Sequence, residues 1–415
     1  ALRFCFQLSP IVRAIRNVEL MVIHGLLVLL LTLPASGYKT PAKRGNERGR
    51  RRLQKHQRIE SPGVIYVAVN ETSSAVSALR ELLPTPTSAG ELLALGAVYY
   101  RRPGGHRFKR MGSALIPSNS NQRDCIQDAV VEQGGELRVH TEPKRYPACS
   151  LATWQNWAER LRYIGLDYIV VDKPAGVPCA PHVSNGREWL VPFVSAALAG
   201  ALAGNRRRAA TSRVNYSSTE SEQLVACQRL DAATSGLAVL ARTKRAADDF
   251  RCLLQTGHDI TKRYRALVEH TNLKANQRLE HWISDAVFGK PAPRLIAPLS
   301  ASVDASDHTW RPARSTILSA TSLHDRQDIL LELATGRTHQ LRAQLAALQA
   351  PIINDTLYKG MKGFLWSGPC DDGIATDLVH SAKHQEQLPL ALQCCELRFS
   401  NIRVEASAPW WASHE

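Results

Sequence analysis

Runs of bulky apolar residues, separated by short turn signals, dominate the chain between Tyr163 and Trp411. Short runs that are rich in branched side chains and bounded by turn residues are typical of strands. The runs that predict strands lie at 168–173, 236–242, 262–269, 328–334 and 391–399. Cys394 and Cys395 fall in the last of these runs, so we expect them in the core.

Helical spacing replaces this pattern in two places. An amphipathic helix is predicted from about Lys244 to Leu254, directly after the strand at 236–242. A second helix follows a Thr-Gly-Arg turn; its Leu341, Leu345 and Leu348 share one face, and Pro351 follows its end. Positions three apart are neighbours on a helix surface. His339 and Arg342 are therefore expected side by side on the other face.

The first sixty residues have a pattern of their own. The apolar run from Val22 to Leu33 is too short to span a bilayer, which needs roughly 20 residues. Nine Lys or Arg and one acid follow between Lys39 and Arg58, a balance typical of a transit peptide. We predict a bipartite presequence over 1–60 that directs the protein to a plastid. A mitochondrial address, simple secretion and a membrane anchor remain alternatives, and we expect no stable anchor after processing.

Residues 70–142 predict a small α/β module. Its helix runs into a strand, a basic turn and a second strand after a Gly-Gly turn. The turn would place Arg101, Arg102, Arg107, Lys109 and Arg110 on one edge suited to phosphates. The segment resembles the small αL RNA-binding domain named after a ribosomal protein of the small subunit. The alternative is a structural appendage without RNA contacts. A low-complexity insertion is predicted at 183–222.

Composition narrows the class of partner. The chain has 415 residues, with 52 Lys plus Arg against 37 Asp plus Glu, and its net charge is +15. An acidic polymer is the natural partner of such a surface, although a basic presequence and solvated faces would account for part of the charge. None of the nine cysteines forms a C-x-x-C pair. We therefore expect reduced thiols and no metal.

The segment QRLDAATSG at 228–236 isolates one carboxylate, Asp231, before an apolar run. A carboxylate in a partly buried cleft needs a cation to stay ionised, and Arg342 could supply a bidentate partner. Glycosidase chemistry normally needs two carboxylates, but no second acid accompanies Asp231 in its motif. One Asp, the nearby Tyr264 and several Arg favour chemistry on a nucleoside inside a polyanion.

Four segments carry a family resemblance. In order and spacing, DKPAGVP, RLDAATSG, KRYRALV and TGRTHQLRAQLAALQAPIINDTLY resemble signature segments of the RluA family of RNA pseudouridine synthases. The similarity covers about residues 160–405. It implies an α+β catalytic domain in which a mixed, largely antiparallel and bent sheet surrounds a basic cleft, preceded by the small α/β module. It also implies isomerisation of uridine to pseudouridine without cofactor or metal.

The resemblance assigns roles to individual residues. Asp231 matches the nucleophile, Tyr264 the ring that stacks on the flipped uracil and helps deprotonate carbon five, and Arg342 the ion-pair partner of the Asp. Whether Asp231 attacks the sugar or assists glycal formation stays open. Arg229 matches the side chain that replaces the flipped base. The residues expected to shape the substrate pocket are Arg337, Thr338 and Gln340.

Other positions are expected to have structural roles. Gln228 stands where the family usually has His, so contacts to flanking nucleotides are expected to differ. His339 is expected to hydrogen-bond near the helix start, and Asp355 and Tyr358 to be packing and turn residues.

Three functional hypotheses remain open at this stage. The first is a monomeric RNA pseudouridine synthase acting on ribosomal, transfer or organellar RNA, with Arg101, Arg102, Lys109 and Arg110 on the RNA backbone. The second is a non-catalytic RNA-binding or ribosome-assembly protein with the same fold. The third is a nucleoside hydrolase, which would release free uracil.

Overall fold

The computed structural model describes residues 57–61, 63–80, 88–111, 130–149, 157–198, 224–257, 259–269, 272–284, 294–301, 310–359 and 389–414. The predicted presequence therefore lies almost wholly outside the described residues, as do positions 199–222 of the predicted insertion. Positions 190–198 of that insertion are helical. In the described part of the chain, no helix has the length and apolar character needed to cross a membrane.

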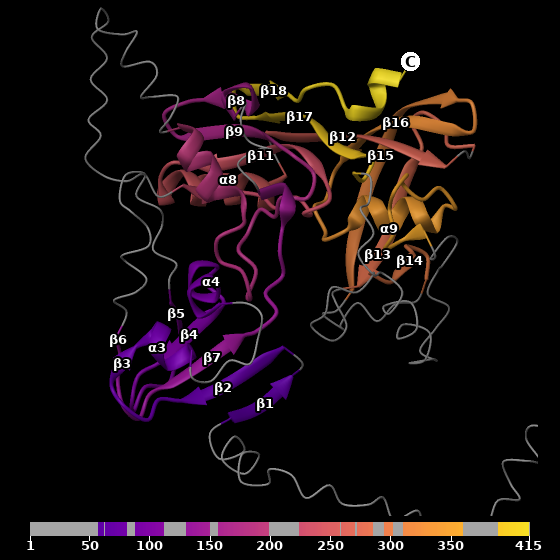
Figure 1. Ribbon diagram of the computed structural model, residues 1–415. Helices are drawn as coiled ribbons and strands as arrows, with labels where there is room; N and C mark the ends of the chain where they lie inside the picture. The colour runs from indigo at the N-terminus through magenta and orange to yellow at the C-terminus, as the bar shows by residue number, and fades with distance from the viewer. Residues whose placement is uncertain are drawn as a thin grey trace, which may run out of the picture. The chain divides into compact units, whose positions relative to one another are not determined.

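A five-stranded sheet forms the small N-terminal module (Figure 1). Its order is β1 (Gln57–Ser61), β2 (Val64–Ala68), β7 (Glu136–His140), β4 (Val98–Arg101) and β5 (Lys109–Arg110). A short pair, β3 (Ser73–Ser74) with β6 (Val130–Val131), lies apart from this sheet. Strand β1 begins inside the stretch predicted as presequence, because pairing with β2 incorporates the end of the basic segment into the sheet.

Two short helices cover one face of this module. α3 (Ala75–Arg80) and α4 (Ala89–Ala94) bury Leu79, Leu92 and Leu93 against inward-facing strand residues such as Leu137 and Val139. Ser88 caps α4 by accepting a hydrogen bond from the backbone N–H of Glu91 at 3.1 Å. Successive strand residues face opposite sides. Tyr99, Arg101 and Arg138 therefore lie on the face away from these helices.

The part of the described chain that follows this module is built on a sheet of eleven described strands. The main path is β14 (Ile296–Pro298), β13 (Arg278–Ser284), β15 (Trp310–Leu323), β16 (Arg326–Leu333), β12 (Ile260–Glu269), β17 (Leu392–Phe399), β11 (Ser235–Ala241), β9 (Tyr168–Lys173) and β8 (Leu161–Ile164). β10 (Val225–Ala226) pairs with β11, and β18 (Ile402–Glu405) pairs with β17. Among the described pairs in this sheet, β11 with β17 is parallel and the others are antiparallel. The predicted mixed, largely antiparallel α+β fold is confirmed.

The central strands are buried on both faces. From Gly236 to Ala241 every residue of β11 is buried, and so is every residue of β9 after Tyr168. α8 (Lys244–Thr256) lies against β11 (Figure 1) and places Phe250 beside Tyr168 and Phe399. Thr243 caps its start. Burial on both faces explains why these strands are continuous apolar runs in the sequence.

The second predicted helix is present as α9 (Gln340–Ala347), and it is enclosed on all sides. Leu341 and Leu345 join the main core, as the sequence predicts. Gln340, Arg342 and Gln344 on the remaining surface are buried as well. α9 lies beside β13 and β14 (Figure 1), so its polar side chains must find partners inside the protein.

Three shorter helical segments complete the described chain. They are η1 (Pro147–Cys149), α6 (Trp157–Arg160) and η4 (Trp410–His414). η4 contributes Trp411, whose indole N–H donates to the Asp328 carboxylate at 3.0 Å. The C-terminal end is thereby fixed to β16.

Candidate active site

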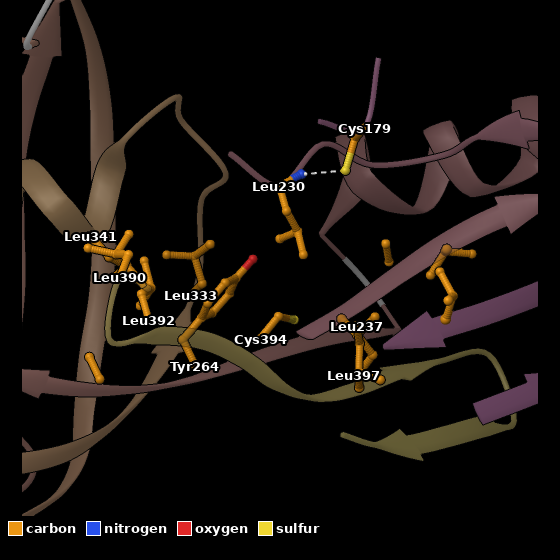
Figure 2. Packing of buried hydrophobic residues seen from close by; sticks show 14 of the residues in the cluster. Cys179, Leu230, Leu237, Tyr264, Leu333, Leu341, Leu390, Leu392, Cys394 and Leu397 are labelled. Carbon is orange, nitrogen blue, oxygen red and sulfur yellow. Dashed lines mark hydrogen bonds between the residues drawn. The ribbon is translucent and has the colours of Figure 1, made fainter. Parts of the chain in front are cut away.

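Asp231 lies in the loop that leads from β10 into β11. Its neighbour Leu230 is buried in the core and donates its backbone N–H to the Cys179 sulfur at 3.4 Å (Figure 2). The Asp231 side chain keeps 22% of its surface exposed. Gly236, the second residue of β11, has a φ of 101°, and a side chain there would collide with the backbone of Cys394. The core thus fixes both ends of the loop while the carboxylate faces outward.

The Lys-Pro-x-Gly turn holds this loop in place, a contact that the motif alone did not reveal. Lys173 is fully buried, and its ammonium donates to the carbonyls of Val177 at 2.8 Å and Ala232 at 3.2 Å. The backbone N–H of Gly176 also donates to Ala232, at 2.7 Å. Burial lowers the pKa of Lys173 to about 8, so it remains largely protonated at neutral pH. The signal in the sequence was a lysine ending an apolar strand.

The expected bidentate pair between Arg342 and Asp231 is wrong. Arg342 instead forms its bidentate pair with Asp355, from Nε to Oδ2 at 2.8 Å and from Nη2 to Oδ1 at 2.7 Å. Its third nitrogen, Nη1, lies 3.7 Å from Asp231 Oδ2. Asp355 has no exposed side-chain surface, so it needs an ion-pair partner more strongly than the half-buried Asp231 does.

Asp355 also remains a turn residue, as expected. Its Oδ1 accepts the backbone N–H groups of Leu357 at 3.1 Å and Tyr358 at 3.2 Å. These bonds fix the carboxylate, and the carboxylate fixes the guanidinium. Asp355 therefore sets the orientation of Arg342 through Nε and Nη2, and the remaining nitrogen, Nη1, faces Asp231.

Tyr264 projects from β12 beneath the Asp231 loop. Figure 2 shows its hydroxyl directed toward Leu230, with Cys394 beside the ring. Only 8% of the residue is exposed. Burial raises its pKa well above the usual value, and the nearby charge of Asp231 acts in the same direction. The hydroxyl is therefore neutral in the substrate-free protein and can take up a proton only if it passes its own proton on.

Residues 228 and 229 flank the carboxylate in different ways. Gln228 donates from Nε2 to the carbonyl of Leu237 at 3.2 Å, which ties the position usually held by His to the β11 backbone. Arg229 is exposed beside Asp231. An exposed arginine at this place is free to enter a bound nucleic acid.

The turn before α9 adjoins a cavity of about 280 Å³. Its lining residues are Ile283, Ser284, Arg311, Gly336, Arg337 and Thr338. Gln340 holds the turn from behind: its Oε1 accepts from the Thr335 hydroxyl at 2.8 Å and from the Arg337 N–H at 3.0 Å. A larger hollow of about 510 Å³ between β8 and β18 contains none of the predicted site residues, so its size does not indicate the chemistry.

His339 was expected to be structural, but its ring reaches the predicted nucleophile. Its Nε2 lies 3.7 Å from Asp231 Oδ2, the same oxygen that Arg342 approaches. Its Nδ1 lies 3.1 Å from the Tyr358 hydroxyl. The i and i+3 spacing in the sequence predicted that His339 and Arg342 are neighbours, but not that both face Asp231.

Two of the four residues predicted to contact the RNA backbone have partners within the protein. Arg101 pairs with Glu136, and its guanidinium lies 4.9 Å from the Phe108 ring centre. Arg110 donates to the carbonyls of Gly96 at 2.6 Å and His182 at 2.9 Å. Arg101 and Arg110 lie on the face of the sheet away from α3 and α4, and their guanidinium groups are engaged there. The others, Arg102 and Lys109, are exposed, as is Arg107.

Potential metal ligands and thiols are scattered through the described part of the chain. Within the described ranges, no group of three or more His, Cys, Asp or Glu is placed to hold a metal ion. The described cysteines are free thiols, namely Cys149, Cys179, Cys227, Cys252, Cys394 and Cys395. Burial raises the pKa of Cys395 to about 11 and that of Cys227 to about 12. These two are therefore thiols rather than thiolates at neutral pH.

The comparisons with known proteins agree on one protein family. The model of the RNA pseudouridylate synthase family matches residues 167–347. "RNA pseudouridine synthase 6, chloroplastic" of Arabidopsis thaliana is 25% identical over 72% of this chain, and the rice protein of the same name is equally similar. The chain spans 65% of the length of each of these two relatives.

A bacterial relative is matched over more of its length. "Ribosomal large subunit pseudouridine synthase D" of Xanthomonas campestris is 31% identical, over 68% of this chain and 76% of that protein. Among solved structures, "Human RNA Pseudouridylate Synthase Domain Containing 4" covers 63% of this chain and 94% of its own, with 20% identity and a TM-score of 0.45. On the family match and the bacterial relative, the chain belongs to the RluA family of RNA pseudouridine synthases.

Proposed function

We propose that this protein isomerises uridine to pseudouridine in RNA, with Asp231 as the nucleophile. The observation that carries the proposal is the convergence of three distant segments on one carboxylate. The loop before β11 supplies Asp231, α9 supplies Arg342 at 3.7 Å, and β12 supplies the buried Tyr264 beneath them. A protein that only bound RNA would need no such arrangement.

The reaction is balanced without any co-reactant. The bond from N1 of uracil to C1′ of the ribose breaks, the detached base rotates, and a bond from C5 to C1′ forms. The proton on C5 is then lost, and N1 gains one. Asp231 either attacks C1′ or removes a proton from the sugar to give a glycal, and both routes need an ionised carboxylate. Nη1 of Arg342 faces this carboxylate at 3.7 Å.

Tyr264 serves the detached base in this scheme. The target nucleotide must leave its stack to reach Asp231, and an aromatic ring beneath it replaces part of the lost stacking. The neutral hydroxyl of Tyr264 relays the C5 proton by accepting it while giving up its own. Arg229, exposed beside the loop, takes the place of the extruded base.

The basic residues of the module indicate the binding partner, and the names of the relatives indicate the location in the cell. We propose that Arg102 and Lys109, together with Arg107, contact phosphates of ribosomal, transfer or organellar RNA. Two matched relatives are named as chloroplastic and one yeast relative, "tRNA pseudouridine(32) synthase, mitochondrial", as mitochondrial. We therefore propose an organellar protein, first of all plastid, that acts as a monomer without a metal or cofactor.

The test is to map pseudouridines in organellar ribosomal, transfer and messenger RNA after incubation with the purified protein. New pseudouridine at defined positions, with no free uracil, is the expected result, and a chelator should leave it intact once the RNA is folded. Tight RNA binding without pseudouridine would instead indicate a binding or assembly protein. Free uracil would indicate a hydrolase.

A further inference from the structure

His339 has an unusual backbone for the residue that precedes a helix. Its φ is 58°, in the left-handed region that residues other than glycine rarely adopt, and its side chain makes no capping hydrogen bond. A strained backbone of this kind persists only where the surrounding structure holds it in place, and such residues cluster at active sites. Here the imidazole, 15% exposed, is directed toward Asp231 instead of the helix end.

The hydrogen bonds around Tyr358 favour one position for the proton on His339. The Tyr358 hydroxyl accepts the backbone N–H of Arg294 at 2.8 Å, and a backbone N–H can only donate. The single phenolic proton is then available to His339 Nδ1, 3.1 Å away. If Nδ1 accepts, a neutral imidazole carries its proton on Nε2. That N–H faces Asp231 Oδ2 at 3.7 Å.

The surroundings favour this neutral state. Burial lowers the pKa of His339, and the charges of Arg342 and Arg294 act in the same direction. Asp231 and Asp355 oppose them. Burial also raises the pKa of Tyr358, so its hydroxyl keeps the proton that it donates.

A neutral donor has a chemical advantage here. Asp231 already faces the positive edge of Arg342, and a second full positive charge would stabilise the carboxylate further and weaken it as a nucleophile or base. A neutral N–H can orient the carboxylate with less loss of reactivity. Orientation itself matters because a misplacement of about 1 Å can cost about 100-fold in rate.

We propose that His339 is a positioning residue: its Nε2–H orients Asp231, and the Tyr358 hydroxyl fixes the tautomer that makes this possible. The role rests on the proposed isomerisation, because it acts through Asp231. The tautomer, by contrast, is a property of the protein alone. It can be measured whether or not the protein is a synthase.

The first experiment measures the tautomer directly. Protein labelled with ¹⁵N in its histidine rings is compared with His339→Gln to assign the His339 signals, and with Tyr358→Phe. We expect the wild-type protein at pH 7 to show a neutral ring protonated at Nε2, and Tyr358→Phe to show a mixture of tautomers. A wild-type ring protonated at Nδ1 would overturn the proposal.

The second experiment measures the chemical step under single-turnover conditions. His339→Gln retains an N–H donor near the Nε2 position, whereas His339→Leu does not. We expect Gln to stay within about threefold of wild type and Leu to lose between about 10- and 100-fold, with RNA affinity unchanged in both. Equal rates for Leu and wild type would contradict the proposal.

A matched control separates orientation from backbone strain. His324 also has a left-handed φ, 51°, but is exposed in the turn between β15 and β16. His324→Leu should leave the rate unchanged. If wild-type protein forms no pseudouridine at all, the proposed function fails, and the tautomer measurement still decides whether His339 is held toward Asp231.

Discussion

Arginine is used in opposite ways in the active site and in the small module. Arg342 is buried, its orientation is set by a bidentate bond to Asp355, and one edge of its guanidinium is left for Asp231. In the module, Arg102 on the loop after β4 and Lys109 at the start of β5 are both exposed. A buried arginine must be paired, and the pairing fixes the orientation of its guanidinium. An exposed one provides long-range attraction that salt screens.

The module itself contains both kinds of arginine. Arg110 lies only one residue from Lys109, yet it donates to two backbone carbonyls, one of them in the segment after β9. The difference follows from strand alternation, which directs adjacent side chains to opposite faces. Position along a basic run therefore does not tell which charges are available to RNA.

The largest expected effect comes from breaking the buried pair. Asp355→Ala leaves the Arg342 charge buried without its partner, so we expect the free energy of unfolding to fall by about 3 to 5 kcal/mol. Urea denaturation measures this. Glu136→Ala breaks the more exposed pair with Arg101 and should cost about 1 kcal/mol or less. Equal losses would show that burial does not distinguish the two pairs; should Asp355→Ala not fold, Asp355→Asn serves in its place.

A smaller loss of stability is expected from Arg110→Ala. The substitution leaves two backbone carbonyls without a charged donor, which should lower the free energy of unfolding by about 1.5 to 3 kcal/mol. Arg102→Ala is the matched control and should stay within about 0.5 kcal/mol of wild type. If the two variants are equally stable in urea, Arg110 is not a structural residue and belongs with the exposed group.

Acid should weaken the module through His140. Burial and the nearby charges of Arg138 and Arg110 lower its pKa to about 4, so it is neutral in the folded protein. The unfolded chain takes up this proton below about pH 6.5. Stability due to the neutral ring is thus present above pH 6.5 and is lost as the pH falls toward 4. Thermal melts should show a shallower loss for His140→Phe, and an identical pH dependence would argue against this assignment.

The exposed basic residues should affect RNA binding without affecting stability. Replacing Arg102, Arg107 and Lys109 with Ala should reduce the slope of log affinity against log salt by about 2, at roughly 0.7 for each lost phosphate contact. Turnover at saturating RNA should change little. A filter-binding titration at several salt concentrations measures the slope, and an unchanged slope would exclude this loop from the RNA interface.

Much of the fold is readable from the sequence because the central elements are buried on both faces. β9 and β11 are near-continuous apolar runs, and their pattern predicts them. β12 and β17 mix apolar residues with charged or polar ones, but each keeps enough buried apolar positions to be predicted as a strand. β15 is different: its fourteen residues alternate between buried and exposed without a strong run, so it gave no clear signal. β1 was missed because it begins at the end of a basic stretch and has no strong apolar run of its own, so its pairing with β2 is what makes it a strand.

The site was predicted in its members more fully than in its contacts. Motifs place Asp231, Tyr264 and Arg342 together, but no sequence pattern shows which of two carboxylates forms the bidentate pair with the Arg342 guanidinium. Asp355 in an Asn-Asp turn has the appearance of an ordinary turn residue, and only its complete burial beside Arg342 reveals the pair. Lys173 and His339 were likewise identified by what surrounds them in space.

The central claim is that Asp231 performs the isomerisation, and Asp231→Asn tests it most directly. Under single-turnover conditions, with pseudouridine quantified by mass spectrometry of the digested RNA, the amide keeps the shape of the side chain but not its nucleophile. We expect no detectable pseudouridine and RNA affinity within about tenfold of wild type. Turnover within about tenfold of wild type would contradict it.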